Sequence, residues 1–324
     1  MKTILLTGAA GFIGAETTKL LLERGDQVIG VDNLNDYYDV SLKLHRLENL
    51  KKFSNFNFLH LDIEDKKAVD ELFQKYTIDA VLNLAARAGV RYSMDNPFVY
   101  FTTNVNGLLN ILEAMKVNGV NKLIQASTSS LYAGLPLPFT ESLQVDSPIS
   151  PYAASKKAAE VLAYTYHHLY KFDVTILRYF TVYGPSGRPD MSILRFIKWI
   201  DEGKELQLFG DGTQTRDFTF VTDIAEGTIA ALDKINGYDV FNLGGGKKPI
   251  TMSEIISIIE GLLDKKARIK KLPFHQADMS ETQANIERAK LKLKWEPKVG
   301  VKEGIEKTVQ WYLENHEFCK RLKV

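Results

Sequence analysis

The sequence predicts an α/β protein with a Rossmann-type doubly wound parallel sheet and a smaller α/β C-terminal lobe. Short, continuous apolar runs of strand length alternate with longer segments that have helical spacing. A glycine-rich turn over residues 7–14 joins the first such strand to the first helix. Strands in a parallel sheet are buried on both faces, so their apolar runs are continuous, and this pattern persists to about residue 180.

The elements follow one another in a regular order along the first half of the chain. Strands are expected over 2–8, 27–33, 56–62, 79–86, 122–129 and 174–180. Helices are expected over 15–25, 68–76 and 104–119 and from about 152 onward. Further on, helices are expected over 192–203 and 251–265 and strands over 205–210 and 239–245. We therefore expect a first domain over 1–180, to which 218–245 returns, and a second lobe over 181–217 and 246–324.

Composition excludes several classes of protein. Among 324 residues, 41 Lys and Arg balance 40 Asp and Glu, so bulk charge gives no reason to expect a nucleic-acid or membrane partner. The apolar start, MKTILLTGAAGFIG, is interrupted by glycine and followed by a charged helical pattern, which argues against a targeting segment. The single cysteine, Cys319, cannot form a disulfide within the chain, which favours a cytoplasmic protein. We expect no metal site.

The turn at residues 7–14 has glycine at positions 8, 11 and 14. Glycine lets the chain turn tightly, so that backbone N–H groups at the helix N-terminus can approach a pyrophosphate. The second strand ends in Asp32, eighteen residues after Gly14, where a carboxylate can bind an adenosine ribose diol and repel a 2′-phosphate. The pattern therefore predicts NAD rather than NADP, although such a glycine turn can also be only a turn, and Asp32 only a loop residue.

A second motif, Tyr152-Ala-Ala-Ser-Lys156, is expected on a helix, where positions i and i+4 share one face. A protonated lysine beside the phenol favours phenolate and should lower the tyrosine pKa toward neutrality, which would make a base. A hydroxyl cluster, ASTSSLY at 126–132, follows an expected strand, where open α/β sheets bind ligands. Taken singly, these features could also be a surface pair and a polar loop.

Together these motifs resemble the extended short-chain dehydrogenase/reductases that modify nucleotide sugars. Four stretches, 32–47, 86–97, 150–160 and 178–191, more narrowly resemble the UDP-glucuronate 4-epimerases. The resemblance runs from residue 1 to about 245 and more loosely to the end. Two positions depart from the family pattern, with Ser186 in place of a tryptophan and Ala277 in place of a glycine.

The resemblance implies an NAD-dependent 4-epimerase with a catalytic set of Thr128, Tyr152 and Lys156, although Ser129 or Ser130 could replace Thr128. The cofactor-binding residues that it implies are Gly8, Gly11, Phe12, Ile13, Gly14, Asp32, Asn33, Asp62, Ile63, Leu84, Ala85, Ala86, Asn104, Tyr152, Lys156 and Tyr179. The substrate-binding residues that it implies are Arg87, Ser129, Ser130, Thr181, Arg188, Arg216 and Asp278. The second lobe would then bind the nucleotide sugar.

Arg188 lies in a stiff loop, GPSGRPD, just beyond an expected strand. A guanidinium fork matches a carboxylate, so Arg188, helped by Thr181, is predicted to bind the carboxylate of a uronate. Arg87 and Arg91 are further cations in a loop after a strand. A solvent-facing loop arginine is the competing interpretation, and it would favour a UDP-glucose/UDP-galactose 4-epimerase. The sequence also leaves room for a UDP-glucuronate decarboxylase and for a non-catalytic NAD-binding regulator.

A homodimer is also expected. The helices near 104–118 and 152–170 are richer in apolar residues than one sheet face requires, and the family resemblance places them at a two-fold interface. The residues that suggest this interface are Leu108, Leu109, Ile111, Leu112, Leu162, Tyr166 and Leu169.

Overall fold

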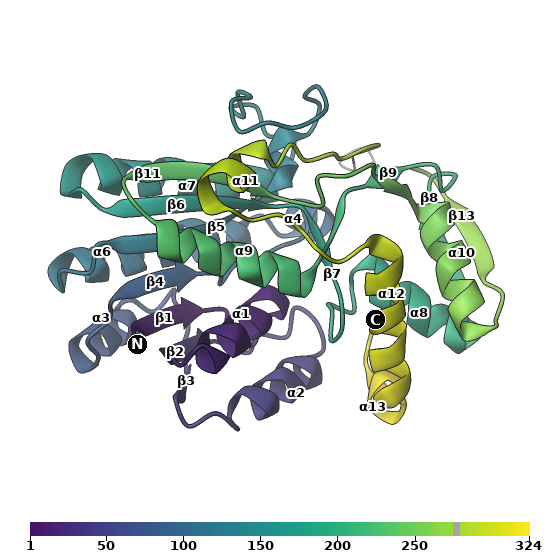
Figure 1. Cartoon of the computed structure of the whole chain (residues 1–324), viewed down its shortest axis with the longest axis horizontal. Coiled ribbons are helices and arrows are strands. Elements are labelled where there is room, and N and C mark those ends of the chain that lie inside the picture. The colour runs from purple at the N-terminus through teal and green to yellow at the C-terminus, as the bar shows by residue number, and fades with distance from the viewer. Residues whose placement is uncertain (275–278) are drawn as a thin grey trace.

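The computed structural model describes residues 1–274 and 279–324 and contains a seven-stranded parallel sheet (Figure 1). Its strand order is β11-β6-β5-β4-β1-β2-β3. The strands are β1 (Thr3–Thr7), β2 (Gln27–Asp32), β3 (Phe56–His60), β4 (Ala80–Asn83), β5 (Lys122–Thr128), β6 (Asp173–Tyr179) and β11 (Tyr238–Leu243). This is the doubly wound α/β fold that the sequence predicts.

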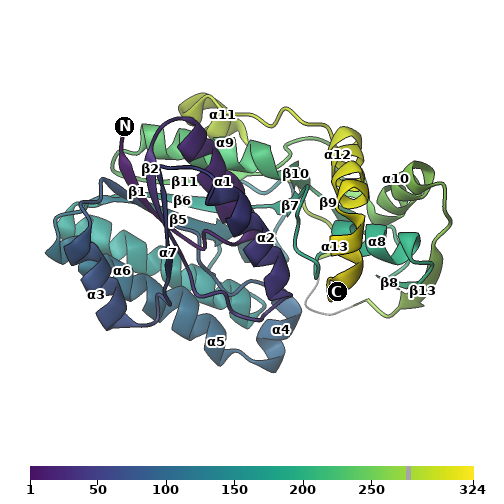
Figure 2. The same ribbon diagram turned by 90° about the horizontal axis from the view of Figure 1, so that it is seen from below.

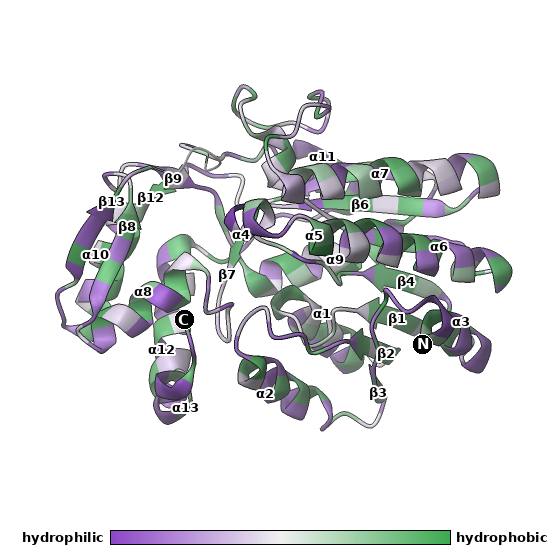
Figure 3. Ribbon diagram, turned by 180° about the vertical axis from the view of Figure 1, so that it is seen from behind, coloured by the Kyte–Doolittle hydropathy of each residue, from purple (hydrophilic) through white to green (hydrophobic). Residues whose placement is uncertain are grey.

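Helices cover both faces of this sheet. One layer is α1 (Phe12–Glu23), α2 (Val40–Leu50), α9 (Val221–Lys234) and α11 (Glu287–Leu293); the other is α3 (Lys66–Lys75), α6 (Leu108–Val117) and α7 (Pro151–Tyr170). Along β1, Ile4 and Leu6 enter the first core, whereas Leu5 enters the second. Side chains alternate across a strand, so a continuous apolar run supplies both cores. In Figure 3, hydrophobic and hydrophilic residues alternate along the covering helices.

The helix that carries the tyrosine–lysine motif has clear ends. Ser150 caps α7 by accepting a hydrogen bond from the backbone N–H of Ala153, and Pro151 occupies the first turn. Lys171 ends the helix in the left-handed conformation. Beside it lie α4 (Val90–Asp95), α5 (Phe98–Phe101) and the π-helical turn η1 (Thr102–Gly107). The cap and the proline fix where α7 begins and so place Tyr152 in its first turn.

A second lobe follows beyond β6. It contains α8 (Ser192–Asp201), α10 (Met252–Leu263), α12 (Val301–Glu314), α13 (His316–Arg321) and the parallel pair β8 (Glu205–Phe209) and β13 (Arg268–Leu272). Its own core includes Ile197, Leu206, Ile255 and Tyr312. Figure 2 shows these elements beside the large sheet, with the C-terminus at α13.

Two further short strand pairs lie outside the large sheet. The pairs are β7 (Thr181–Tyr183) with β10 (Phe218–Phe220), and β9 (Thr215–Arg216) with β12 (Ile250–Thr251). The chain returns to the large sheet through α9 and β11, because β11 pairs with β6. The strand β10 pairs with β7 and lies outside that sheet. The sequence prediction missed α2, α4, α5, α9, α11, α12 and α13.

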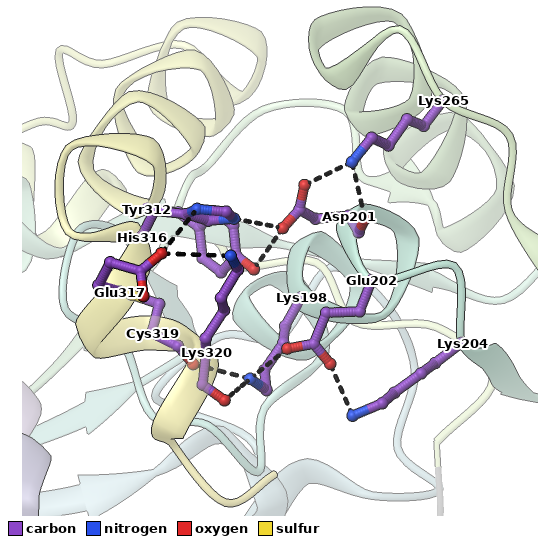
Figure 4. A network of polar contacts seen from close by, with 10 residues as sticks. All are labelled: Lys198, Asp201, Glu202, Lys204, Lys265, Tyr312, His316, Glu317, Cys319 and Lys320. Carbon is purple, nitrogen blue, oxygen red and sulfur yellow. Dashed lines mark hydrogen bonds and ion pairs between the residues drawn. The ribbon is translucent and has the colours of Figure 1, made fainter.

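A network of polar contacts fastens the C-terminal helices to α8 (Figure 4). The buried ammonium group of Lys198 donates to Glu202 and to the backbone carbonyls of Cys319 and Lys320. It thereby adds a hydrogen bond to two carbonyls at the end of α13, where the last helical carbonyls run out of N–H partners within the helix. Near the other end of α13, the His316 ring lies 2.8 Å from the carboxylate of Asp201 on α8. The C-terminus is thus an integral part of the second lobe.

Four of the seven residues that suggested the dimer interface are buried within the chain itself. Leu108, Ile111, Leu112 and Tyr166 belong to the core between the sheet and α6 and α7. Leu109 and Leu169 are exposed, and Leu162 is partly buried. Helical periodicity directs these four toward the sheet, so only Leu109, Leu162 and Leu169 of the seven remain to contribute to an interface.

Candidate active site

A cleft of about 660 Å³ lies at the carboxyl ends of the central strands, between the two lobes. The first lobe contributes the loops after β1, β2, β4 and β5 and the start of α7, while the second contributes residues of α8, β8 and β9. In open α/β sheets, ligands bind at this edge, where the strand order reverses. Most of the predicted site residues line this one cleft, although they are far apart in the sequence.

The glycine turn is packed too tightly for larger residues. A Cβ atom on Gly14 would lie 2.0 Å from the carbonyl oxygen of Gly8, and Gly8 itself has φ +74°. The backbone N–H of Gly8 donates to the carbonyl of Val31 at 2.7 Å, which holds the turn against β2. Phe12 and Ile13 also line the cleft at the start of α1. The turn therefore presents backbone and a helix N-terminus to the cleft, as binding of a pyrophosphate requires.

Asp32 ends β2 at the same cleft. Its two carboxylate oxygens accept hydrogen bonds from the backbone N–H groups of Ala10 and Leu34, at 3.1 and 2.8 Å. The ammonium group of Lys43 on α2 is buried and lies 3.8 Å from the same carboxylate. Burial lowers the pKa of Lys43, while the charge of Asp32 raises it. This lysine was not predicted as a site residue.

Other predicted cofactor residues continue the cleft along the strand ends. The Asn33 side chain donates to the carboxylate of Asp62 at 2.7 Å, which joins the loops after β2 and β3. The cleft-lining residues in this part are Asn33, Asp62, Ile63, Leu84, Ala85, Ala86 and Tyr179. The phenol of Tyr179 is hydrogen-bonded to Thr228 at 2.8 Å, behind the cleft.

The predicted catalytic residues come together at the end of β5. Tyr152, in the first turn of α7, is hydrogen-bonded to the side chain of Thr128. The hydroxyl of Thr128 also accepts from the backbone N–H of Ser130, at 3.1 Å. Lys156, one turn along α7, faces the same cleft and is almost fully buried. Of the hydroxyls in the cluster, Thr128 is the one that acts on the pKa of the phenol.

The expected depression of the Tyr152 pKa is not found. Burial raises the pKa of this phenol, and the hydrogen bond from Thr128 and the charge of Arg188 lower it by less. Lys156 is not a cause of the shift, and burial lowers the pKa of its own ammonium group to about 8, against the charge of Glu160. Burial disfavours the charged form of any group. Lys156 therefore loses part of the positive charge that would stabilise the phenolate form of Tyr152.

Arg188 faces the cleft but has a partner within its own loop. Its guanidinium donates to both carboxylate oxygens of Asp190, at 3.0 and 2.6 Å, and to the carbonyl of Ala88 at 3.3 Å. The rings of Tyr37 and Tyr38 lie 5.5 and 5.9 Å from it. The guanidinium is therefore held in one orientation before any substrate carboxylate is considered.

The remaining predicted substrate residues are placed as follows. Arg87, Ser129, Ser130, Thr181 and Arg216 line the cleft, whereas Asp278 lies outside the described residues. Arg91 also lines it, with its guanidinium 3.7 Å from the centre of the Phe209 ring.

Asn104, a predicted cofactor residue, is not among the residues that line the cleft. It lies one layer behind, bonded to the backbone of Arg87 and to the Ser155 hydroxyl. The π-helical turn places Asn104 there, and nothing in the sequence indicates such a turn.

Sequence reasoning missed several cleft residues. The main ones are Tyr37, Tyr38, Lys43, Asp190, Arg195 and Gln214. Asp39 before an apolar periodic segment is a helix-start signal that could have found α2. That Lys43 points back to Asp32 depends on tertiary packing, for which the sequence carries no local signal.

The described part of the chain has neither a cluster of metal ligands nor a membrane-spanning helix. No group of three or more His, Cys, Asp or Glu residues in it could hold a metal ion. None of its helices is both long enough and apolar enough to cross a membrane.

The fold and the cleft together define a dinucleotide-binding α/β protein with a tyrosine–lysine site. Residues 4–244 match the NAD dependent epimerase/dehydratase family, and the chain belongs to that family. It is 57% identical over 320 residues to a UDP-glucuronate 4-epimerase of Thermodesulfobacterium geofontis, covering 99% of both chains. The family resemblance found in the sequence is thereby confirmed.

Solved structures give the same result. The UDP-glucuronic acid 4-epimerase from Bacillus cereus, in complex with UDP-glucuronic acid and NAD, superposes with a TM-score of 0.91 at 38% identity, over 96% of this chain and 99% of that one. A UDP-glucose 4-epimerase from Thermotoga maritima, with UDP-glucose, gives 0.89 at 31% identity, over 97% and 99%.

Proposed function

We propose that this protein is a UDP-glucuronate 4-epimerase, which inverts carbon 4 to give UDP-galacturonate through a 4-keto intermediate. The observation that carries the proposal is the cluster of Thr128, Tyr152 and Lys156 in one cleft with the glycine turn and Arg188. The relative from Thermodesulfobacterium geofontis and the Bacillus cereus complex support both the reaction and NAD as the cofactor.

The residues present fit NAD. The tight turn from Gly8 to Gly14 leaves backbone N–H groups for a pyrophosphate, and Asp32 ends β2 where a ribose diol would lie. Lys156 reaches the cleft from α7 and would hold the cofactor beside the catalytic residues. When bound, NAD accepts a hydride from carbon 4 of the sugar and returns it to the opposite face.

The protein side chains handle the proton. Tyr152, in its phenolate form, would take the proton of the 4-hydroxyl, become a phenol and later return the proton. Thr128 is hydrogen-bonded to that phenol and would hold the same sugar oxygen in line. Lys156, when protonated, favours the phenolate form by its charge. The cleft fixes the reacting atoms relative to one another, which supplies a large part of the rate.

The substrate would lie across both lobes, with its sugar carboxylate at Arg188 and Thr181. Arg216 and Arg87 offer cations for the diphosphate, and the second lobe over 181–217 and 246–324 would hold the nucleotide. Since Asp190 binds one edge of Arg188, the carboxylate would meet the terminal nitrogen that Asp190 does not bind. Arg188 then distinguishes uronates from neutral sugars.

A UDP-glucose 4-epimerase is the second candidate. The pairing of Arg188 with Asp190 favours it, because an arginine already neutralised within its loop need not bind a substrate carboxylate. The similarity to the Thermotoga maritima enzyme is consistent with that alternative.

One experiment separates the two. Purified protein is mixed with UDP-glucuronate, and separately with UDP-glucose, without added cofactor. The proposal expects UDP-galacturonate from the first and much slower turnover of the second. Faster turnover of UDP-glucose would favour the neutral-sugar epimerase, and no turnover of either would contradict both.

We also infer a homodimer in the cytoplasm. Apolar side chains remain exposed on α5, α6 and α7, and the most exposed are Phe98, Val117, Val161 and Leu169. A patch of this kind on neighbouring helices suits a second copy of the chain.

The single cysteine, Cys319, is fully buried, which suits a reducing compartment. Fractionation of cells would test the location.

A further inference from the structure

Behind the catalytic cluster lies a buried ion pair that joins α7 to two strands. The carboxylate of Glu160 accepts two hydrogen bonds from the Arg178 guanidinium, at 2.9 and 2.7 Å. It also accepts from the hydroxyl of Ser127, at 2.6 Å. All three residues are at most 4% exposed. A carboxylate therefore links the helix to β5 and to β6 at once.

The linked positions are next to the catalytic ones. Ser127 precedes Thr128 on β5, and its register partner on β6 is Arg178. Glu160 is one turn beyond Lys156 and two turns beyond Tyr152 on α7, so all three share a face. Any shift of α7 along the sheet would change the contact between Tyr152 and Thr128.

We propose that Glu160 is a positioning residue for the reaction. Its carboxylate, held by Arg178 and Ser127, fixes α7 against the ends of β5 and β6 and supplies the buried countercharge for Lys156. This inference rests on the proposed function, because it assigns Glu160 a task in that chemistry. Glu160 itself touches neither substrate nor cofactor and acts through Tyr152, Thr128 and Lys156.

Electrostatics supports the proposed role of Glu160 as the countercharge of Lys156. The elements that pack against α7 carry other titratable groups, among them Arg91, Tyr92 and Asp95 on α4, Tyr100 on α5, Tyr132 after β5, and Arg178 and Tyr179 on β6, but Glu160 is the charge that acts on the pKa of Lys156. Burial lowers the pKa of Lys156 to about 8, and Glu160 is the group that raises it. Without that carboxylate, Lys156 would lose its proton at a lower pH.

The hydrogen-bond network around Glu160 continues on the far side of Arg178. The guanidinium donates to the phenol of Tyr132 at 2.8 Å, and that phenol donates to the Asn242 side chain on β11, also at 2.8 Å. The network therefore reaches across three strands, β5, β6 and β11, and Arg178 has little freedom to move.

The test removes both charges together, because one unpaired charge in the core could unfold the chain. The double variant Glu160→Gln/Arg178→Met is expected to retain bound NAD and to lose about 100-fold in kcat, as for a small misplacement of reacting groups. The alkaline limb of its pH–rate profile should move to lower pH, since Lys156 loses its countercharge. KM should change far less than kcat.

A matched control uses a second buried pair, which does not line the cleft and lies in the second lobe (Figure 4). The double variant Lys198→Met/Glu202→Gln removes a contact of 2.6 Å between a buried lysine and a carboxylate. It should lose stability but keep the wild-type pH–rate profile. Equal profiles for wild type, control and Glu160→Gln/Arg178→Met, at wild-type kcat, would overturn the proposal.

A milder variant keeps the proposal testable if the double variant does not fold. Ser127→Ala removes only the contact between Glu160 and β5, and kcat should fall by about 10-fold with little change in the unfolding free energy. Wild-type kcat in Ser127→Ala would overturn the proposal. The wild-type chain is assayed in parallel, so that a failed proposed function shows as no UDP-galacturonate from wild type.

Discussion

Tyr152 is the residue on which the proposed chemistry depends most. Replacing it with phenylalanine removes one oxygen and keeps the ring that packs edge-on against Tyr100 at 5.9 Å. We expect turnover to be abolished while NAD binding and the unfolding free energy stay close to wild type. Product formation from UDP-glucuronate and the cofactor released on denaturation are the two measurements. A variant that retains more than a few per cent of the rate would show that the phenol is not the base.

Arg188 decides between uronate and neutral-sugar specificity. Arg188→Ala should reduce kcat/KM for UDP-glucuronate. The expected loss of transition-state stabilisation is roughly 2–4 kcal/mol, the usual scale for removing one partner of a charged pair. It should also increase a pentose product that has lost CO₂. Oxidation of carbon 4 creates a β-keto acid, which loses CO₂ when the bond between carbons 5 and 6 aligns with the π-system of the new carbonyl. A carboxylate held in the ring plane cannot reach that alignment.

UDP-glucose is the control for that variant, because it has no carboxylate for Arg188 to bind. The variant should turn it over nearly as well as wild type does. Equal losses on both sugars would mean that the fork between Arg188 and Asp190 only supports the loop. That result would favour the neutral-sugar epimerase.

At the scale of elements, Asp201 at the end of α8 holds three segments of the second lobe. It accepts from Lys265 at 2.7 Å and from the Tyr312 phenol at 2.9 Å, and contacts His316 (Figure 4). Burial would raise its pKa, but the hydrogen bonds from Lys265, His316 and Tyr312 lower it to about 2. A lowered carboxyl pKa stabilises the fold above the ordinary value of 3.8, and this stabilisation is lost as the pH falls toward 2.

We therefore expect Asp201→Asn to lower the unfolding free energy by about 1–3 kcal/mol at pH 7. The difference from wild type should shrink as the pH falls from about 4 toward 2. Urea unfolding at several pH values measures both effects. Glu317→Gln is the matched control, since that carboxylate is 83% exposed and should have little effect. A difference that does not depend on pH would contradict the assignment.

Elements also show where sequence reasoning stops. The apolar runs at β1, β2, β4, β5 and β6 were predicted because continuous burial leaves a continuous pattern. The helix α2 was missed although Asp39 precedes its apolar periodic segment, and α13 because much of what holds it is Lys198, 121 residues away from Cys319. Contacts over such separations leave no periodic signal in the sequence.

At the scale of the whole molecule, the exposed apolar side chains of α5, α6 and α7 predict a homodimer. Light scattering at micromolar concentration should give twice the mass of one chain. Val161→Glu should shift the mass toward the monomer, because it places a charge in the proposed interface. Leu291→Glu, on an exposed leucine of α11, is the control and should remain dimeric. A monomeric wild type would contradict the prediction.

The sequence by itself determined the fold class, the glycine turn with Asp32, and the pairing of Tyr152 with Lys156. These depend on local spacing, since a strand, a turn and a helical i, i+4 pair are encoded within a few residues.

Only the tertiary structure showed that Thr128 acts on the phenol of Tyr152, that Asp190 holds Arg188, and that Glu160 links α7 to β5 and β6. It also placed Asn104 behind the cleft. The physical reason is that hydrogen bonds and burial depend on which groups meet after folding, and burial in turn determines which groups keep their charge.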